Sequence, residues 1–353
     1  YNPKDAVAFT NKGMALADLK KYEEAIDAYQ DAINLDVTDL KAWTSLGQVY
    51  TTLKEYDNAV KAFQMALKLN KTDSSIWKNI GDVLMLEKRY DEALAAYEQA
   101  IALNRKDTGG WVGKGKALAS LSRYKEGLGV FEIACAMEPQ YTSAWVGKGD
   151  CLSGLGFTNE ADIAYESALQ LDPRNSVALA AKSKNLISLG DSDTALSSLQ
   201  LAIIADPMNI GLKSRLVEIY EKKGNYQDAL AIWDSLESDM ADPNLVRKGR
   251  ALTLVRAGRV QDALNLYHDV LSEDTGSGML FEQYGDVLSL AGDSVNAENA
   301  YRKAMELQPN LTGIALKIQT LESMKNKTPL GVPVILCALL IGLCHIYIRR
   351  SDR

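Results

Sequence analysis

Histidine and cysteine are scarce in this chain, whose 353 residues include two histidines and four cysteines. These side chains supply many metal ligands, catalytic bases and nucleophiles, so few such sites can be built from them. His268 and His345 have no neighbour at a metal-ligand or catalytic spacing. Cys337 and Cys344 lie in an apolar stretch, and the other two cysteines make no disulfide framework. We therefore predict a protein that is not an enzyme, with no catalytic residue, cofactor or metal.

Dense positive charge is also missing from the sequence. The formal net charge is −7, and no run of five or more Lys or Arg residues occurs. Phosphate backbones attract clustered basic side chains, so we predict that the protein does not bind nucleic acid. Apolar residues make up 47% and charged residues 24% of the chain, which is typical of a chain that folds largely in water.

The sequence does contain a pattern that returns every 34 residues. Each period has a large apolar residue, a small residue four positions later, then an alanine, an aromatic residue and a second alanine. In the second period these are Trp43, Gly47, Ala59, Phe63 and Ala66. This spacing predicts two amphipathic helices per period. Nine periods without insertion or deletion begin at Ala6, Leu40, Ser74, Thr108, Thr142, Ser176, Ile210, Asn244 and Gly278.

These residues resemble the motif of the tetratricopeptide repeat family, whose repeat is a hairpin of two helices. The resemblance implies an all-α fold, a right-handed α-solenoid of nine helical hairpins over residues 1–311. A stacked array leaves its last hairpin with an open apolar face, so we predict a capping helix at 312–327. The sixth and seventh repeats depart from the motif at Ser183 and Lys213 and are expected to keep the register with altered packing. The fourth has Gly127 where alanine is usual, which costs about 1 kcal/mol of helix propensity and predicts a less stable hairpin.

A long apolar segment follows the repeats. Leu330 to Ile348 is nineteen residues without a charge, and eleven of them are Leu, Ile or Val. A helix of that length spans roughly 28 Å, close to the ~30 Å thickness of a bilayer's hydrocarbon core. We predict that residues 328–353 form one C-terminal transmembrane helix with a short basic tail, which makes the protein single-pass.

Two topologies for this span stay open. A removed signal peptide would place the repeats outside the cytoplasm, whereas a tail anchor would leave them in the cytosol. The first residue is Tyr1 rather than Met, which favours the extracytoplasmic topology. Arg349 and Arg350 follow the span, but Lys325 and Lys327 precede it, so the flanking charges do not decide the orientation.

The family resemblance also implies where a partner binds, because first helices line a concave groove in that family. Carried over to repeats three to five, the ligand-facing positions include Gly113 and Gly147, which leave the centre bare for a partner backbone or helix. The alternative is that both glycines only permit tight packing. The residues predicted to bind the partner are Lys78, Asn79, Asp82, Val112, Gly113, Lys116, Val146, Gly147 and Asp150.

A chaperone tail is not the expected partner. Family members that hold such tails carry a clamp of Lys and Asn across three successive repeats. The matching positions in this chain are Thr10, Met14, Ser45, Ser75 and Asn79.

Together these features predict a membrane-tethered scaffold for protein–protein interactions that binds a partner segment in its groove. The alternative is a structural subunit or assembly factor of a larger membrane or cell-surface complex, also without catalytic activity.

Overall fold

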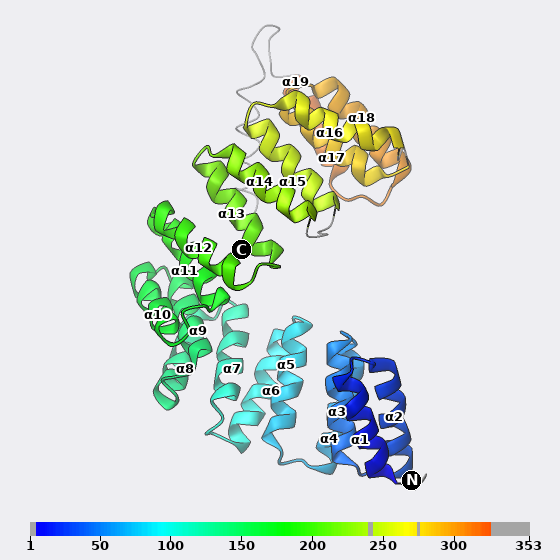
Figure 1. Ribbon diagram of the computed structural model, residues 1–353, viewed down its shortest axis with the longest axis vertical. Coiled ribbons are helices and arrows are strands. Elements are labelled where there is room, and N and C mark those ends of the chain that lie inside the picture. The colour runs from blue at the N-terminus through cyan, green and yellow to red at the C-terminus, as the bar shows by residue number, and fades with distance from the viewer. Residues whose placement is uncertain (1–4, 239–242, 274–275, 326–353) are drawn as a thin grey trace. The chain divides into compact units, whose positions relative to one another are not determined.

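The computed structural model describes residues 5–238, 243–273 and 276–325. Within these residues the chain forms nineteen helices and no β-strand (Figure 1). It divides between Ala205 and Asp206 into two compact units, here called unit 1 and unit 2. Each unit is a series of helical hairpins in which a first helix is followed by an antiparallel second helix.

The hairpins of unit 1 follow the predicted period. The first helices are α1 (Ala6–Asp18), α3 (Leu40–Thr52), α5 (Ser74–Leu86), α7 (Thr108–Ser120), α9 (Thr142–Gly154) and α11 (Ser176–Leu189). The second helices are α2 (Tyr22–Leu35), α4 (Tyr56–Leu69), α6 (Tyr90–Leu103), α8 (Tyr124–Met137), α10 (Thr158–Leu171) and α12 (Ser192–Ala205).

Unit 2 contains three further hairpins and one single helix. The hairpins are α13 (Ile210–Lys222) with α14 (Tyr226–Ser238), α15 (Pro243–Arg256) with α16 (Val260–Glu273), and α17 (Gly278–Leu290) with α18 (Ser294–Leu307). The single helix is α19 (Ile314–Lys325), inside the range predicted for a cap. Its Ile314, Ile318 and Leu321 are buried against α18.

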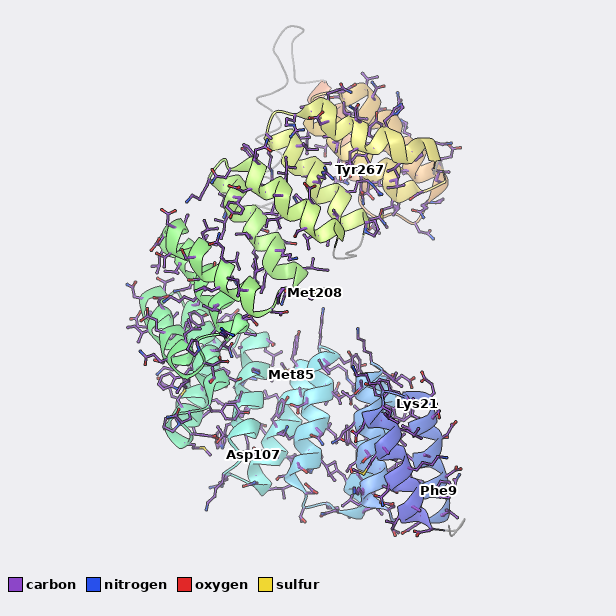
Figure 2. All side chains as sticks on the ribbon, in the orientation of Figure 1. Phe9, Lys21, Met85, Asp107, Met208 and Tyr267 are labelled. Carbon is purple, nitrogen blue, oxygen red and sulfur yellow. The ribbon has the colours of Figure 1, made fainter. Side chains whose placement is uncertain are left out.

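A short polar side chain starts most first helices. Asp107, at the start of α7 (Figure 2), accepts a hydrogen bond from the Gly109 N–H at 3.1 Å. Such a cap satisfies one of the backbone donors that a helix N-terminus leaves unpaired. The side chains that cap first helices in this way are Asp5, Asp39, Asp73, Asp107, Asn175, Asn209 and Ser277.

A left-handed residue ends the first helix in all nine hairpins. In the later repeats this residue is glycine, for example Gly156 at φ +85°. In the first four repeats Lys20, Lys54, Lys88 and Ser122 adopt the same conformation, with φ between 59° and 63°. A side chain in this region costs roughly 1–2 kcal/mol, so the turns of the first four repeats are strained.

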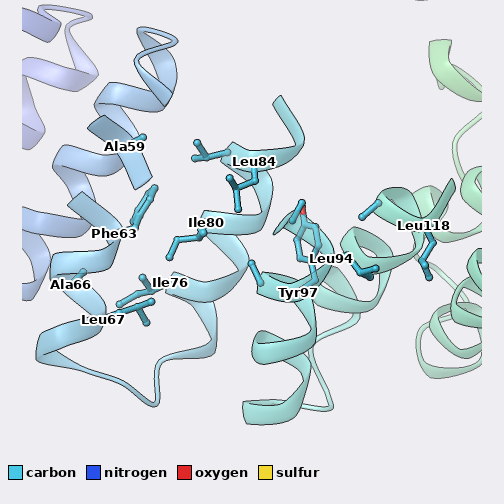
Figure 3. Packing of buried hydrophobic residues seen from close by; sticks show 14 of the residues in the cluster. Ala59, Phe63, Ala66, Leu67, Ile76, Ile80, Leu84, Leu94, Tyr97 and Leu118 are labelled. Atoms are coloured by element: carbon cyan, nitrogen blue, oxygen red, sulfur yellow. The ribbon is translucent and has the colours of Figure 1, made fainter. Parts of the chain in front are cut away.

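Aromatic residues of the second helices fill the core. Figure 3 shows Phe63 and Tyr97 with Ile76 and Ile80 in the cluster that joins the second and third repeats. Each ring lies against the small residue of its own first helix. A Cβ added at Gly81 would lie 2.7 Å from Cε1 of Tyr97, so only glycine fits there.

Two departures from the motif have local structural explanations. Ser183 is buried and donates a hydrogen bond to the Ala195 carbonyl at 2.8 Å, which ties the sixth hairpin together. Lys213, which departs from the motif in the seventh hairpin, is also buried. At Gly127 a Cβ would lie 2.9 Å from the Cys151 Sγ, so glycine makes room for a neighbouring thiol.

The predicted membrane span at 330–348 lies outside the described residues. Among the helices that the structure does describe, none combines the length and apolar character needed to cross a bilayer.

The strained turns give a testable prediction. Lys88→Gly should raise the free energy of unfolding by about 0.5–1 kcal/mol, because the relief of left-handed strain exceeds the entropy that glycine adds to the unfolded chain. The measurement is the urea midpoint followed by circular dichroism. The matched control is Gly156→Ala, which places a side chain in the same conformation and should lower the midpoint. An unchanged or lower midpoint for Lys88→Gly would show that this turn is not strained.

Candidate binding surface on the first helices

The first helices lie on the inner side of the stack in unit 1. Neighbouring first helices touch, as α5 does with α7, α7 with α9 and α9 with α11, whereas neighbouring second helices lie farther apart. A stack whose two sides differ in this way curves toward the side of the first helices. On that side Lys116 and Ser120 are exposed one helical turn apart on α7. We use "inner surface" for the accessible side chains of α5, α7, α9 and α11.

Four of the nine residues predicted to bind a partner are buried. Val112 and Val146 are 4% and 6% exposed. A Cβ on Gly113 would overlap the Tyr97 ring, and one on Gly147 would overlap the Phe131 ring. The two glycines therefore accommodate aromatic residues of the preceding repeat, and tight packing is the reason for their small size.

The other five predicted residues are accessible on three neighbouring first helices. Lys78, Asn79 and Asp82 lie on α5, Lys116 on α7 and Asp150 on α9. Lys184 occupies the equivalent place on α11 and is also exposed. Lys184 is not among the nine predicted residues, although it follows Asp150 by one 34-residue period, as Asp150 follows Lys116.

Buried tyrosines hold three aspartates at this position of the repeat. The hydroxyl of Tyr97 donates to Asp82 Oδ1 at 2.7 Å, and that of Tyr165 donates to Asp150 Oδ1 at 2.9 Å. In unit 2, Tyr301 donates to Asp286 Oδ1 at 2.8 Å. Burial and the adjacent carboxylate raise the pKa of each of these tyrosines far above its ordinary value, so each hydroxyl stays a donor.

The sequence carries a signal for these pairs in the spacing of the two residues. In each pair the tyrosine follows its aspartate by fifteen residues. Where the ring is Phe63 or Phe131 and has no hydroxyl, the residue fifteen positions earlier is Gln48 or Lys116. In these five repeats, a carboxylate therefore occupies this position only where the hydroxyl of a buried tyrosine needs a hydrogen-bond acceptor.

Two of the three aspartates also bind a lysine of this chain. Lys78 Nζ lies 3.0 Å from Asp82 Oδ2, and Lys317 Nζ lies 2.7 Å from Asp286 Oδ1. Among the described residues, no cation forms an ion pair with Asp150. Partial removal of water by its surroundings raises the pKa of the Asp150 carboxyl, while the Tyr165 hydrogen bond and the ammonium groups of Lys184 and Lys116 act in the opposite direction.

Other lysines of the same helices are held by the preceding repeat. Lys114 pairs with Glu98 at 2.8 Å, and Lys182 pairs with Glu166 at 2.9 Å, each sixteen residues apart. Lys148 and Glu132 form the equivalent pair at 3.6 Å. Lys116 and Lys184 form no such pair with any described residue, so they are the lysines of α7 and α11 that are left for a partner.

Several charges on the first helices of unit 2 are paired with one another. Glu221 accepts a hydrogen bond from Thr253 Oγ1 at 2.6 Å and forms an ion pair with Arg256. Lys317 lies 2.7 Å from Glu282 as well as from Asp286.

The described cysteines are poorly suited to chemistry. Cys135 and Cys151 are buried. Burial raises the pKa of the Cys135 thiol above its ordinary value, and it raises the pKa of the Cys151 thiol to about 12. A thiol is a weak nucleophile because only the thiolate reacts readily. No group of His, Cys, Asp and Glu able to hold a metal ion occurs among the described residues.

Comparison with known families identifies the repeats. A tetratricopeptide repeat model matches residues 6–39, 40–73 and 74–107, and a second tetratricopeptide repeat model matches residues 142–175. The chain therefore carries tetratricopeptide repeats. Comparison with curated proteins finds no significant match.

Solved structures share the fold. PilW, a widely conserved type IV pilus biogenesis factor, is 20% identical over 60% of this chain and 98% of its own, with a TM-score of 0.53. PilF of Pseudomonas aeruginosa is also 20% identical, over 60% of this chain and 97% of its own, with a TM-score of 0.50. At this identity the likeness shows the fold alone.

The packing of the inner glycines gives a second prediction. Gly147→Ala should lower the free energy of unfolding by about 1–3 kcal/mol, because the added methyl group overlaps the Phe131 ring. Gly129→Ala on α8 is the matched control. A Cβ at Gly129 meets no atom within 4 Å, so this change should raise stability through helix propensity. Thermal unfolding of the full chain measures both. Equal stabilisation by the two changes would contradict the packing role of Gly147.

Proposed function

We propose, from the tetratricopeptide repeats that the chain carries, that it is a non-catalytic scaffold for protein–protein interactions. The partner lies along the inner surface of unit 1. The observation that carries this proposal is the row of exposed charges at Lys116, Asp150 and Lys184, one on each of three neighbouring first helices, with no ion pair to any described residue.

Exposed charges of this kind favour binding because no existing ion pair has to be broken before they meet a partner. The inner surface also presents accessible side chains from neighbouring repeats in a single row, which suits an elongated segment. Hydrogen bonds and charge pairs spread over several repeats give specificity, although each alone contributes little in water.

A second candidate function has an observation of its own. Large apolar side chains are exposed on second helices of unit 1, with Ile163 on α10 64% exposed and Ile204 on α12 72% exposed. Apolar area of this kind favours burial against other subunits. It supports the alternative of a structural subunit or assembly factor, in which the outer side of the stack is covered.

Site-specific photo-crosslinking separates these two functions. A photoreactive amino acid replaces Ser120 on the inner surface or Ile163 on the outer side, and the full chain is irradiated in the cells that make it. The scaffold proposal expects discrete crosslinked proteins from position 120 and few from position 163. Crosslinks from position 163 alone favour the assembly role, and no crosslinks from position 120 overturn the inner-surface proposal.

We further propose that the segment from Leu330 to Ile348 tethers the repeats to a membrane. The support is its sequence: nineteen residues without charge are long enough for a helix to span the hydrocarbon core. Repeats outside the cytoplasm and repeats in the cytosol are both compatible with this tether. Digestion of sealed membranes by an external protease distinguishes them.

The tether can be tested by extraction of membranes with alkaline carbonate. The full chain should stay in the membrane fraction, because the segment is integrated in the bilayer. Leu339→Arg combined with Leu340→Arg should release it, since each central arginine costs about 2.5–3.5 kcal/mol of insertion free energy. Leu339→Ile with Leu340→Ile is the control and should behave as the wild type. Release of the unmodified chain by carbonate would contradict the tether.

A further inference from the structure

Repeat symmetry provides an internal comparison for Asp150. Asp82, Asp150 and Asp286 occupy the same position of the third, fifth and ninth repeats, and each accepts a hydrogen bond from a buried tyrosine. At Asp82 and Asp286 the carboxylate also receives a lysine ammonium, from Lys78 and Lys317. In two repeats of this chain, the tyrosine-held carboxylate therefore binds a lysine ammonium group.

The fifth repeat lacks the lysine that serves Asp82. Lys78 precedes Asp82 by four residues, and the residue that precedes Asp150 by four is Val146, which is buried. The Asp150 carboxylate is therefore oriented by Tyr165 through one oxygen but has no ion-pair partner among the described residues. A fixed carboxylate binds a cation with less loss of side-chain freedom than a free one.

We propose that Asp150 binds a lysine or arginine side chain of an extended partner segment, and that acidic side chains on both sides of this residue bind Lys116 and Lys184. This inference rests on the proposed scaffold function and specifies the partner. The support is charge complementarity: the inner surface presents a cation, an anion and a cation on α7, α9 and α11. A partner with the opposite order pairs all three.

The spacing of the partner's charges follows from helix packing. Because α7 touches α9 and α9 touches α11, neighbouring axes are about 8–10 Å apart. An extended segment in the polyproline II conformation rises about 3.1 Å per residue and turns every third side chain to the same face, so about three residues lead from one first helix to the next. The expected sequence pattern is acidic, two residues, basic, two residues, acidic.

The flanking lysines also exclude simpler partners. Lys116 and Lys184 both act electrostatically on Asp150, and together the three side chains carry one net positive charge. A purely basic segment is therefore repelled on both sides of Asp150. A purely acidic segment would satisfy the lysines but would place a carboxylate against Asp150, where like charges disfavour binding.

Synthetic peptides test this pattern by fluorescence anisotropy with the full chain in detergent at low salt. The matched peptide has Glu, Arg and Glu, with two residues from Ala, Ser and Thr between neighbouring charges. The inverted peptide has Arg, Glu and Arg in the same frame, and the acidic peptide has Glu at all three places. We expect the matched peptide to bind at least about tenfold more tightly than either of the others, since each mismatched charge loses one charge-assisted contact. Equal binding, or no binding, of the three peptides overturns the proposal.

Substitutions on the chain assign the effect to Asp150. Asp150→Asn should weaken binding of the matched peptide about threefold, and Asp150→Lys should transfer the preference to the acidic peptide. Asp286→Asn is the matched control: it alters the same tyrosine-held carboxylate where Lys317 already occupies it, and should leave the affinity unchanged. Circular dichroism checks that each variant is folded. Equal weakening by Asp150→Asn and Asp286→Asn would mean that the loss is not local to Asp150.

This result is distinguishable from failure of the scaffold function. If photo-crosslinks from position 120 persist while the peptides show no charge preference, the inner surface binds a partner and the assignment of Asp150 is wrong. If neither is seen, the inner surface of unit 1 is not the binding site.

Discussion

The fit of one aromatic ring between two glycines is the interaction on which the third and fourth repeats depend. Tyr97 lies against Gly81 of its own repeat and Gly113 of the next, and Phe131 lies in the same way against Gly115 and Gly147. Each ring thus joins a hairpin internally and also joins it to its neighbour. The two first helices can approach closely because neither presents a Cβ to the ring, and this approach places them on the inner side of the curve.

The same ring determines part of the surface chemistry. A phenylalanine needs only apolar neighbours, whereas a buried tyrosine must find an acceptor for its hydroxyl. Asp82 and Asp150 provide that acceptor at the inner surface. A tyrosine in the core is therefore associated with a carboxylate that a partner can reach. In the seventh repeat the ring is Trp233, whose Nε1 donates to Thr253 Oγ1 at 2.9 Å. Core and surface are therefore coupled through single hydrogen bonds.

Much of the helical architecture follows from the sequence, because apolar periodicity and turn residues repeat without interruption. The left-handed conformation of Gly156 could be predicted, since glycine adopts it without strain. The same conformation at Lys88 could not, because nothing in a lysine signals it and the geometry comes from the surrounding hairpin. The sequence marks Gly113 and Gly147 as unusual, but it does not tell their role. A small residue is compatible with an open groove and also with close packing against an aromatic ring of the preceding repeat. The structure resolves that ambiguity through the positions of Tyr97 and Phe131.

Most of the surface of each first helix is used for packing, so recognition of a partner has to extend over several repeats. A helix of thirteen residues such as α7 packs one side on its own second helix and another on the preceding repeat. The remaining strip carries few accessible side chains, among them Lys116 and Ser120. A single repeat therefore offers too few contacts for a specific partner. Because the buried glycines and rings determine stability and the exposed strip determines charge, the charge pattern can change from repeat to repeat while the stack is preserved.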